Sequence, residues 1–406
     1  MDIPSLPKKP KHIRTVYLDY AAATPLDPEV FSKMEPFLKD SFANPSSLYA
    51  AGQKAKKAIE YARNQVAQIL HTQKDTIIFT SGATESCNLA IRGAASQKKG
   101  HIITTSIEHH AVLEPINELQ KAGFAITHIQ PDENGVVNVS AIEKAIRKDT
   151  VLISVMYANN EIGSIQSIAD IGRMILRWRK KNNTVYPYFH TDASQIPGNA
   201  TLDVEKLHID LLTASGAKIY GPKGVGILYK RRGIVLQPLM FGGSQEFGYR
   251  SGTENTAAII GFGFALEKIV KEQEKTVKQL AQLRDYFSQC IQKHIPDCAI
   301  NGPGLKNAAE RLVNNLHIHF SGVSAEALLL YLDAYGISVG IGSACTTDNT
   351  NPSHVLLAIS KTQKEATSSV RFTLGKGTTK KDIDYVMKYL PDTVSSLRHM
   401  NTISVL

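Results

Sequence analysis

The sequence predicts an α/β protein with a large domain, built on a mainly parallel seven-stranded sheet between helices, and a smaller α+β domain. Two observations lead to this prediction. Over the first two-thirds of the chain, short apolar runs alternate with amphipathic helical segments, and such alternation is typical of a parallel sheet with helices on both faces. Later in the chain it gives way to one long helical stretch at 261–294, followed by mixed strand-like and helix-like segments.

Seven apolar runs are the candidates for the strands of the large sheet. They cover 76–79, 101–105, 125–129, 151–156, 186–191, 210–213 and 226–229. Helical segments cover 47–70, 84–95, 112–122, 139–148 and 167–180. In the small domain, 312–320 and 369–374 are strand-like, 325–335 is helix-like, and 340–353 is a loop rich in Gly, Ser, Thr and Asn. We therefore assign 18–265 to the large domain, and 1–17 together with 266–406 to the small one.

Composition and charge narrow the class of protein. The chain has 406 residues and a net charge of +9. This surplus could attract tRNA or an acidic protein, but a solvated basic surface is the interpretation that we favour, and we expect no direct nucleic-acid binding. No run of about 18 apolar residues occurs, so we predict no membrane span. The basic N-terminus has no apolar run behind it, which excludes a secretory signal and favours the cytoplasm, with an organelle matrix as the alternative.

Cysteine spacing gives no sign of a metal site. The four cysteines are Cys87, Cys290, Cys298 and Cys345, and none belongs to a CxxC pair. Neither a zinc knuckle nor a thioredoxin-type redox pair is therefore predicted. Without a secretion signal we expect reduced thiols.

Polar residues follow several of the predicted strands, where open α/β sheets bind their ligands. The strand at 76–79 leads to TSGATE and a helix. Small residues there let backbone N–H groups approach a phosphate at the helix N-terminus, although a plain capped helix start has the same pattern. Other strands lead to His109, Asn160, Asp192 with Gln195, and Ser215 with Lys218. Taken singly, the histidine could be a surface loop residue and the lysine a solvated one.

Together these residues match the needs of pyridoxal 5'-phosphate (PLP). This cofactor requires a lysine for its aldehyde, a carboxylate for its pyridine nitrogen, a phosphate cradle and a group that stacks on its ring. Asp192 would keep the pyridine nitrogen protonated, which makes the ring an electron sink. Lys218, once displaced by substrate, would be the base for the substrate Cα proton.

A series of motifs resembles the cysteine desulfurases of the NifS/IscS group, in the class V aminotransferase family of fold-type I PLP enzymes. The motifs are LDYAAATP at 18–25, NPSS at 44–47, FTSGATES at 79–86, EHHAV at 108–112, NNEIG at 159–163, HTDASQ at 190–195, SGAKIYGPKG at 215–224, RSGTEN at 250–255, GSACT at 342–346 and VRFTLG at 370–375. They run in order through both predicted domains, so the resemblance covers most of the chain.

The resemblance implies a role for each matching residue. Lys218 is similar to the Schiff-base lysine, Asp192 to the partner of the pyridine nitrogen, and His109 to the stacked imidazole. The remaining cofactor contacts would be Gln195 at the ring oxygen and Ala83, Thr84 and Ser215 at the phosphate. Thr253 is similar to a residue that reaches the phosphate of a neighbouring subunit, which implies a homodimer. Asn160 and Arg371 would bind substrate, and an arginine fork suits a carboxylate.

Cys345 resembles the cysteine that accepts sulfur as a persulfide. Its neighbours are small and polar, which suits a loop that carries sulfur from the cofactor to an acceptor. The resemblance implies conversion of L-cysteine to L-alanine, with the sulfur passed to an iron–sulfur scaffold or a tRNA-thiolation relay. We predict no resident metal; a transferred iron–sulfur cluster would use Cys345.

One position departs from the family pattern. The family usually has a histidine before the Schiff-base lysine, where this chain has Ala217. The change removes one donor from the phosphate site and puts PLP affinity in question. Two alternatives therefore stay open beside the desulfurase: a selenocysteine lyase or other class V enzyme, and a non-catalytic scaffold paralogue.

Overall fold

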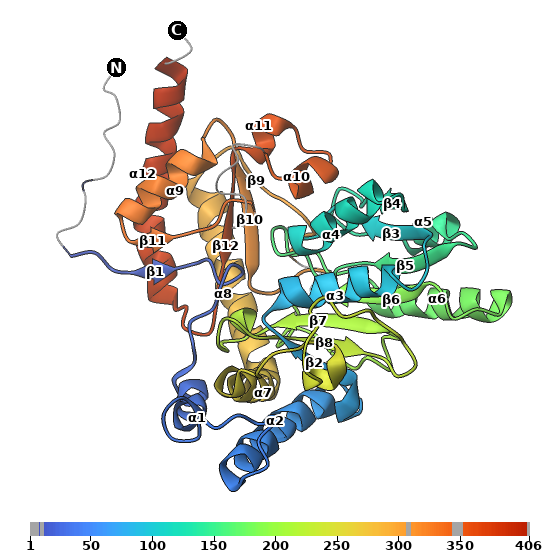
Figure 1. Ribbon diagram of the computed structural model, residues 1–406. Coiled ribbons are helices and arrows are strands. Elements are labelled where there is room, and N and C mark those ends of the chain that lie inside the picture. Colours follow the sequence, from blue (N-terminus) through green and yellow to red (C-terminus); the bar gives the residue numbers. More distant parts are fainter. Residues whose placement is uncertain (1–7, 9–11, 306–309, 343–351, 404–406) are drawn as a thin grey trace.

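The computed structural model describes residues 8, 12–305, 310–342 and 352–403. It contains a seven-stranded sheet between helices and a smaller α+β unit beside it (Figure 1). The fold class predicted from the sequence is therefore confirmed. None of the described helices combines the length and apolar character needed to cross a lipid bilayer.

The large sheet has the strand order β2-β8-β7-β6-β5-β3-β4. Its strands are β2 (Ile77–Thr80), β3 (His101–Thr105), β4 (Ala125–Ile129), β5 (Thr150–Ser154), β6 (Tyr188–Asp192), β7 (Leu211–Ser215) and β8 (Gly226–Lys230). Strand β8 is antiparallel to its neighbours β2 and β7, and the other adjacent pairs are parallel. The sheet is thus mainly parallel, as predicted.

Five of the seven predicted strands are displaced at an end by one or two residues. Strand β6 begins at Tyr188 and not at residue 186, because Pro187 has no N–H for the ladder. Strand β7 continues to Ser215 because its ladder with β8 extends to the pair Ser215–Gly226. This extension brings Ser215 to the carboxyl end of the sheet.

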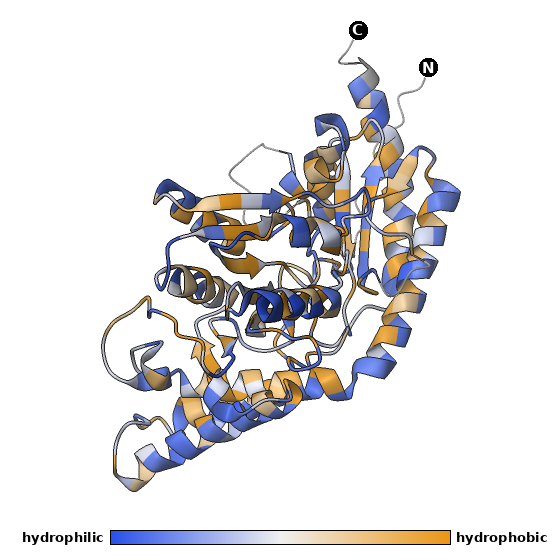
Figure 2. Ribbon diagram, turned by 90° about the vertical axis from the view of Figure 1, so that its right-hand side faces the viewer, coloured by the Kyte–Doolittle hydropathy of each residue, from blue (hydrophilic) through white to orange (hydrophobic). Residues whose placement is uncertain are grey.

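Alternating side chains bury both faces of the large sheet. One face packs against α1 (Pro28–Lys39), α2 (Ala50–Ile69), α5 (Val139–Ala145), α6 (Ile168–Asn182) and α7 (Thr256–Lys271). The other packs against α3 (Ala83–Ala95) and α4 (His110–Lys121). Ile77 and Phe79 belong to the first core and Ile78 to the second, as the two-residue period of a strand requires. Figure 2 shows hydrophilic and hydrophobic residues alternating along the long helices, which each bury one side.

The small unit has its own core and draws on both ends of the chain. Its strands are β1 (Val16–Tyr17), β9 (Cys298–Ile300), β10 (Asn315–Phe320), β11 (Ile337–Ser338) and β12 (Ser369–Thr373), and its helices are α8 (Gln273–His294), α9 (Ala325–Ala334), α10 (His354–Ala358), α11 (Gln363–Ala366) and α12 (Lys380–Ile403). Val16 and Leu18 pack in this core with Phe287 and Phe372, and Figure 1 shows β1 among the orange and red elements. The proposed boundary at residue 18 stays a prediction.

One helical prediction needs correction, and one helix was missed. The single stretch predicted at 261–294 is two helices, α7 and α8, separated at Glu272, where ψ is near 0°. Helix α7 also begins earlier than predicted, at Thr256, because the side chain of Asn255 accepts a hydrogen bond from Ala258 N and caps the helix. Helix α1 was not predicted, although Asp27 and Pro28 form a typical N-cap and first-turn pair.

Candidate active site

Most of the predicted site residues meet beyond the carboxyl ends of β2, β3, β5, β6 and β7. Lys218 ends the short 3-10 helix Gly216–Lys218, directly after β7. Its Nζ donates hydrogen bonds to the carbonyls of Ala21 (2.9 Å) and Ala22 (2.5 Å). Gln195 Nε2 donates to the same Ala21 carbonyl at 3.1 Å. The segment 19–24 therefore forms a wall of the site, a role that the sequence did not reveal.

Asp192 is buried at the end of β6, and its two oxygens have different surroundings. Oδ1 accepts hydrogen bonds from Ser194 N (2.9 Å) and Ser194 Oγ (2.6 Å). Oδ2 has a weak donor, the thiol of Cys87 at 3.8 Å. Burial, and then the Asp192 charge, raise the pKa of Cys87 well above its usual value, so Cys87 stays a thiol. Oδ2 is thus the oxygen suited to a protonated pyridine nitrogen.

His109 begins α4 and is held by its own helix. Its Nδ1 accepts the Ala111 N–H at 3.1 Å, which places the ring proton of the neutral form on Nε2. Burial lowers the pKa of His109; Asp192 opposes that shift and Lys218 adds to it. A neutral imidazole beside Asp192 and Lys218 can lie against an aromatic ring.

A phosphate cradle forms where three strands end together. Gly226 pairs with Thr80 of β2 on one side and with Ser215 of β7 on the other. A Cβ on Gly226 would lie 2.7 Å from the backbone of Gly82, so only glycine allows this approach. Gly82 has φ 153° and begins α3 without a side-chain cap. Ala83, Thr84 and Ser215 are thus brought together at a helix N-terminus that favours an anion.

The two predicted substrate residues also meet. Arg371, on β12, is 1% exposed. Its Nη1 donates to the carbonyls of Asn160 (3.2 Å) and Gly342 (3.0 Å), and its Nη2 donates to Asp19 Oδ1 (2.7 Å). Asn160 follows β5 of the large sheet, so the candidate site lies between the two cores.

One predicted residue is not brought to this cluster, and another lies outside the described residues. Thr253 is exposed in the loop before α7, and its role at a neighbouring subunit stays a prediction. Cys345 lies outside the described residues, as do 343–351 around it. The described flanks of that segment both contact the site: Gly342 through Arg371, and Ser353 through a hydrogen bond from its Oγ to Glu161 Oε2 (2.5 Å).

Sequence reasoning gave no role to Glu108, although it lies in the EHHAV motif. Its side chain is fully buried, and burial raises its pKa to about 8. Oε1 accepts hydrogen bonds from Thr105 Oγ1 (2.9 Å) and Met156 N (2.7 Å). A carboxyl group a few residues after the apolar strand β3 was the available signal, because burying one is costly unless it is neutral or paired. Cys87, predicted to serve packing, does so in the α3 core but also touches Asp192.

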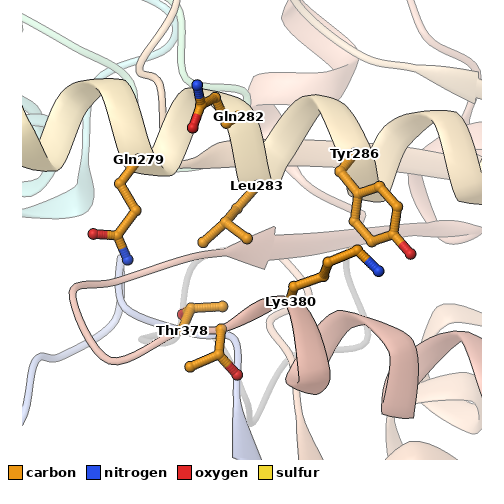
Figure 3. A pocket seen from close by; sticks show the side chains of 7 residues that line it. Gln279, Gln282, Leu283, Tyr286, Thr378 and Lys380 are labelled. Atoms are coloured by element: carbon orange, nitrogen blue, oxygen red, sulfur yellow. The ribbon is translucent and has the colours of Figure 1, made fainter.

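A separate surface cavity of about 480 Å³ lies between α8 and the start of α12 (Figure 3). Its lining residues are Gln279, Gln282, Leu283, Tyr286, Thr378, Thr379 and Lys380. None of them is a predicted site residue, so the cavity is distinct from the cluster around Lys218.

The residues present fit PLP. A lysine, a buried carboxylate with one available oxygen, a neutral imidazole and an uncapped helix N-terminus are the donors and acceptors that this cofactor requires. The backbone carbonyl of Ala217 accepts a hydrogen bond from Thr24 N (2.9 Å), and the Ala217 side chain has no donor for the phosphate. The weaker phosphate binding that we infer from Ala217 stays a prediction.

Comparisons with known proteins agree with the resemblance found in the motifs. The family model for class V aminotransferases matches residues 16–386. The cysteine desulfurase IscS of Dictyoglomus turgidum (strain DSM 6724 / Z-1310) is 47% identical over 388 residues, covering 95% of this chain and 96% of the relative. The cysteine desulfurase IscS of Methanosarcina thermophila is 43% identical, covering 96% and 95% of the two chains.

Solved structures give the same result. A NifS-like protein superposes with a TM-score of 0.86 at 34% identity, covering 97% of this chain and all of the other. The structure of SspA in complex with cysteine superposes with a TM-score of 0.77 at 36% identity, covering 89% and 99% of the two chains. Family match, relatives and fold agree over nearly the whole length. The chain therefore belongs to the class V aminotransferase family and, within it, to the cysteine desulfurases, which are PLP-dependent enzymes.

Proposed function

We propose that this enzyme binds PLP on Lys218, takes sulfur from L-cysteine, leaves it as a persulfide on Cys345 and releases L-alanine. The observation that carries the proposal is the convergence of Lys218, Asp192 and His109 beside an open helix N-terminus, with Arg371 and Asn160 facing them from the junction of the two cores.

Each side chain has a task in this reaction. Bound PLP supplies an electron sink that makes the Cα–H bond of the amino acid acidic. Arg371 binds the substrate carboxylate, and Asn160 lies beside it. Lys218, as a free amine, would take the Cα proton. The carbonyls of Ala21 and Ala22 then accept hydrogen bonds from the resulting ammonium group.

Sulfur transfer needs a nucleophile at the substrate sulfur. The thiolate of Cys345 attacks that sulfur, because thiolates and not thiols are nucleophilic. The S–S bond forms as the C–S bond breaks. The electron pair of the C–S bond returns to the carbon skeleton, which gains a proton and leaves as L-alanine. His109 is the group that we expect to carry the substrate thiol proton.

Quantifying alanine and sulfide together, after cysteine and a reductant are added, tests this function. Wild type should release both in equal amounts. Lys218→Ala should release neither and should lack the visible colour of bound PLP. Lys223→Ala is the matched control, because Lys223 Nζ contacts the same wall at Thr24 O (3.0 Å) but has no assigned step. Loss of turnover in Lys223→Ala with retention in Lys218→Ala would contradict the assignment.

We propose a homodimer with shared sites. Several large apolar side chains are exposed near the loop that carries Thr253 or in the segment that joins α1 to α2: Phe42, Leu48, Tyr49, Phe241 and Phe247. Arg63 of α2 lies 5.1 Å from the Phe247 ring centroid, so the short helix Gln245–Gly248 packs against α2. Exposed apolar surface of this kind marks an interface. A solution mass of one chain by sedimentation would rule out the dimer.

The sulfur acceptor and the location of the enzyme remain proposals. Relatives named IscS favour delivery to an iron–sulfur scaffold, with a tRNA-thiolation relay as the second candidate, in the cytoplasm. A selenocysteine lyase is the alternative activity, and kcat/KM measured for cysteine and selenocysteine separates the two. A scaffold paralogue without activity would be colourless and would release no alanine.

A further inference from the structure

Asp19 is held beside Arg371 by the backbone. Thr373 N donates to Leu18 O (2.7 Å) and Ala21 N donates to Thr373 Oγ1 (2.9 Å), so the segment carrying Asp19 runs along β12 two residues from Arg371. The same segment supplies the carbonyls that hold Lys218 Nζ. One stretch of chain thus fixes the positions of a cofactor lysine and a substrate arginine.

The ion pair between Asp19 and Arg371 occupies a space made for it. A Cβ on Gly340 would fall 2.7 Å from Arg371 Nη2 and 2.8 Å from Asp19 Oδ1. Any other residue at 340 would therefore push the two groups apart. Gly340 also exchanges two backbone hydrogen bonds with Arg371, at 2.7 and 2.9 Å, which fixes the strand opposite the guanidinium.

Arg371 needs a counter-charge when no substrate is bound. Its side chain is 1% exposed, and its Nε has no hydrogen-bond partner among the described residues. The residue opposite it on β10, His317, offers no negative charge, and burial and then Arg371 itself lower the pKa of His317, so it stays neutral and adds no second positive charge. A buried guanidinium without a carboxylate is strongly destabilised. Asp19 supplies that carboxylate from the edge of the site.

We propose that Asp19 is the positioning residue for Arg371: its carboxylate holds the guanidinium in the orientation that receives the substrate α-carboxylate. This inference rests on the proposed role of Arg371 as the carboxylate-binding group. Nη2 is fixed by Asp19 and Nη1 by the carbonyls of Asn160 and Gly342, so the fork is already oriented before substrate arrives. Preorganisation of this kind lowers the entropic cost of binding.

Two amines separate a positioning role from a general structural one. L-alanine carries the α-carboxylate, and ethylamine is the same molecule without it. Both change the visible absorbance of bound PLP, which gives a dissociation constant on the holoenzyme. Asp19→Ala should raise the dissociation constant of L-alanine by about tenfold or more, because a hydrogen bond to a charged group is lost. Ethylamine binding should change less than about twofold, since it does not use Arg371.

Three further variants make the result decisive. Asp19→Asn keeps an oxygen acceptor for Arg371 Nη2, so its dissociation constant for L-alanine should stay within about threefold of the wild-type value. Arg371→Lys alone should weaken the binding of L-alanine. Adding Asp19→Ala to it should cause no further loss, because Asp19 acts only through the guanidinium of Arg371. Asp27→Ala is the control: this carboxylate follows the segment 19–24, pairs with Lys268 at 2.9 Å and should leave the ratio of the two dissociation constants unchanged.

Several outcomes would overturn the inference. Equal losses for L-alanine and ethylamine would show a structural role, and tighter L-alanine binding in Asp19→Ala would show that Asp19 competes with substrate. Additive losses in the double variant would show that Asp19 acts apart from Arg371. If Arg371→Lys itself leaves L-alanine binding intact, the proposed role of Arg371 fails, a result that the single Asp19 variants alone could not produce.

Discussion

Buried ionisable side chains set the charge of the site, and Glu108 illustrates this at the scale of a single residue. Burial raises its pKa to about 8, so the folded enzyme keeps this carboxyl group neutral near pH 7. Asp192 lies close enough that its charge adds to the shift. The position directly before His109 therefore contributes hydrogen-bond acceptors without a second negative charge beside Asp192.

This neutral carboxyl group makes stability fall as pH rises. The unfolded chain loses the Glu108 proton near its ordinary value of 4.5, while the folded chain keeps it to about 8. Between those values the folded state binds one more proton, so this group costs up to about 1.4 kcal/mol of stability per pH unit. Glu108→Gln should remove that cost.

Thermal unfolding of both proteins at about pH 6 and about pH 8 measures the effect. The difference in stability between Glu108→Gln and wild type should shift in favour of the variant as pH increases. Glu118→Gln, a control at an exposed residue (62% side-chain exposure), should show no such shift. A pH-independent difference between wild type and Glu108→Gln would show that Glu108 is already ionised in the folded enzyme.

At the scale of elements, β2 is an edge strand of the large sheet. An ion pair, and not an eighth strand, bonds its outward N–H and carbonyl groups. Arg63 Nη1 donates to Ile77 O (2.7 Å) and Glu246 Oε2 accepts Phe79 N (2.8 Å), so the outward groups of β2 are satisfied. Arg63 and Glu246 are joined by two hydrogen bonds of 2.7 Å. Glu246 and Phe247 have φ of 47° and 58°, which is strained for residues other than glycine, and the ion pair holds them.

Glu246→Gln should therefore destabilise the enzyme. Arg63 is 4% exposed and would keep only the partly exposed Glu60 as a carboxylate partner. Breaking a buried pair on one side costs about 3 kcal/mol or more, which should lower the thermal midpoint by several degrees. Glu35→Gln is the matched control, since the pair Glu35–Lys39 is exposed on α1. Equal midpoints for the two variants would contradict the protective role of the pair.

At the scale of the whole molecule, local patterns predicted the fold better than they predicted the contacts in the site. Alternating apolar runs and amphipathic segments give the seven strands, because each strand and helix depends on neighbouring residues. The pair Asp19–Arg371 joins residues 352 positions apart, and no local pattern encodes such a contact. The break between α7 and α8 was missed for a related reason: the sequence there, KEQEK, has no proline or glycine.

The junction of the two cores also explains why the motifs are spread so widely. Lys218 and Asp192 come from the large sheet, Arg371 from the small one, and the wall at 19–24 from the start of the chain. The site thus exists only when both cores are folded and packed together. The motif resemblance predicted the members of the site, while their hydrogen bonds required the structure.

The central claim is that sulfur moves from cysteine to Cys345, and the mass of the Cys345 peptide tests it most directly. Enzyme mixed with L-cysteine in the absence of reductant should gain one sulfur atom on that peptide and release a matching amount of alanine. Cys345→Ser should bind cysteine yet gain no sulfur and form almost no alanine, because a hydroxyl is a poor nucleophile toward sulfur. Extra sulfur on Cys87, Cys290 or Cys298, or near-normal turnover by Cys345→Ser, would contradict the account.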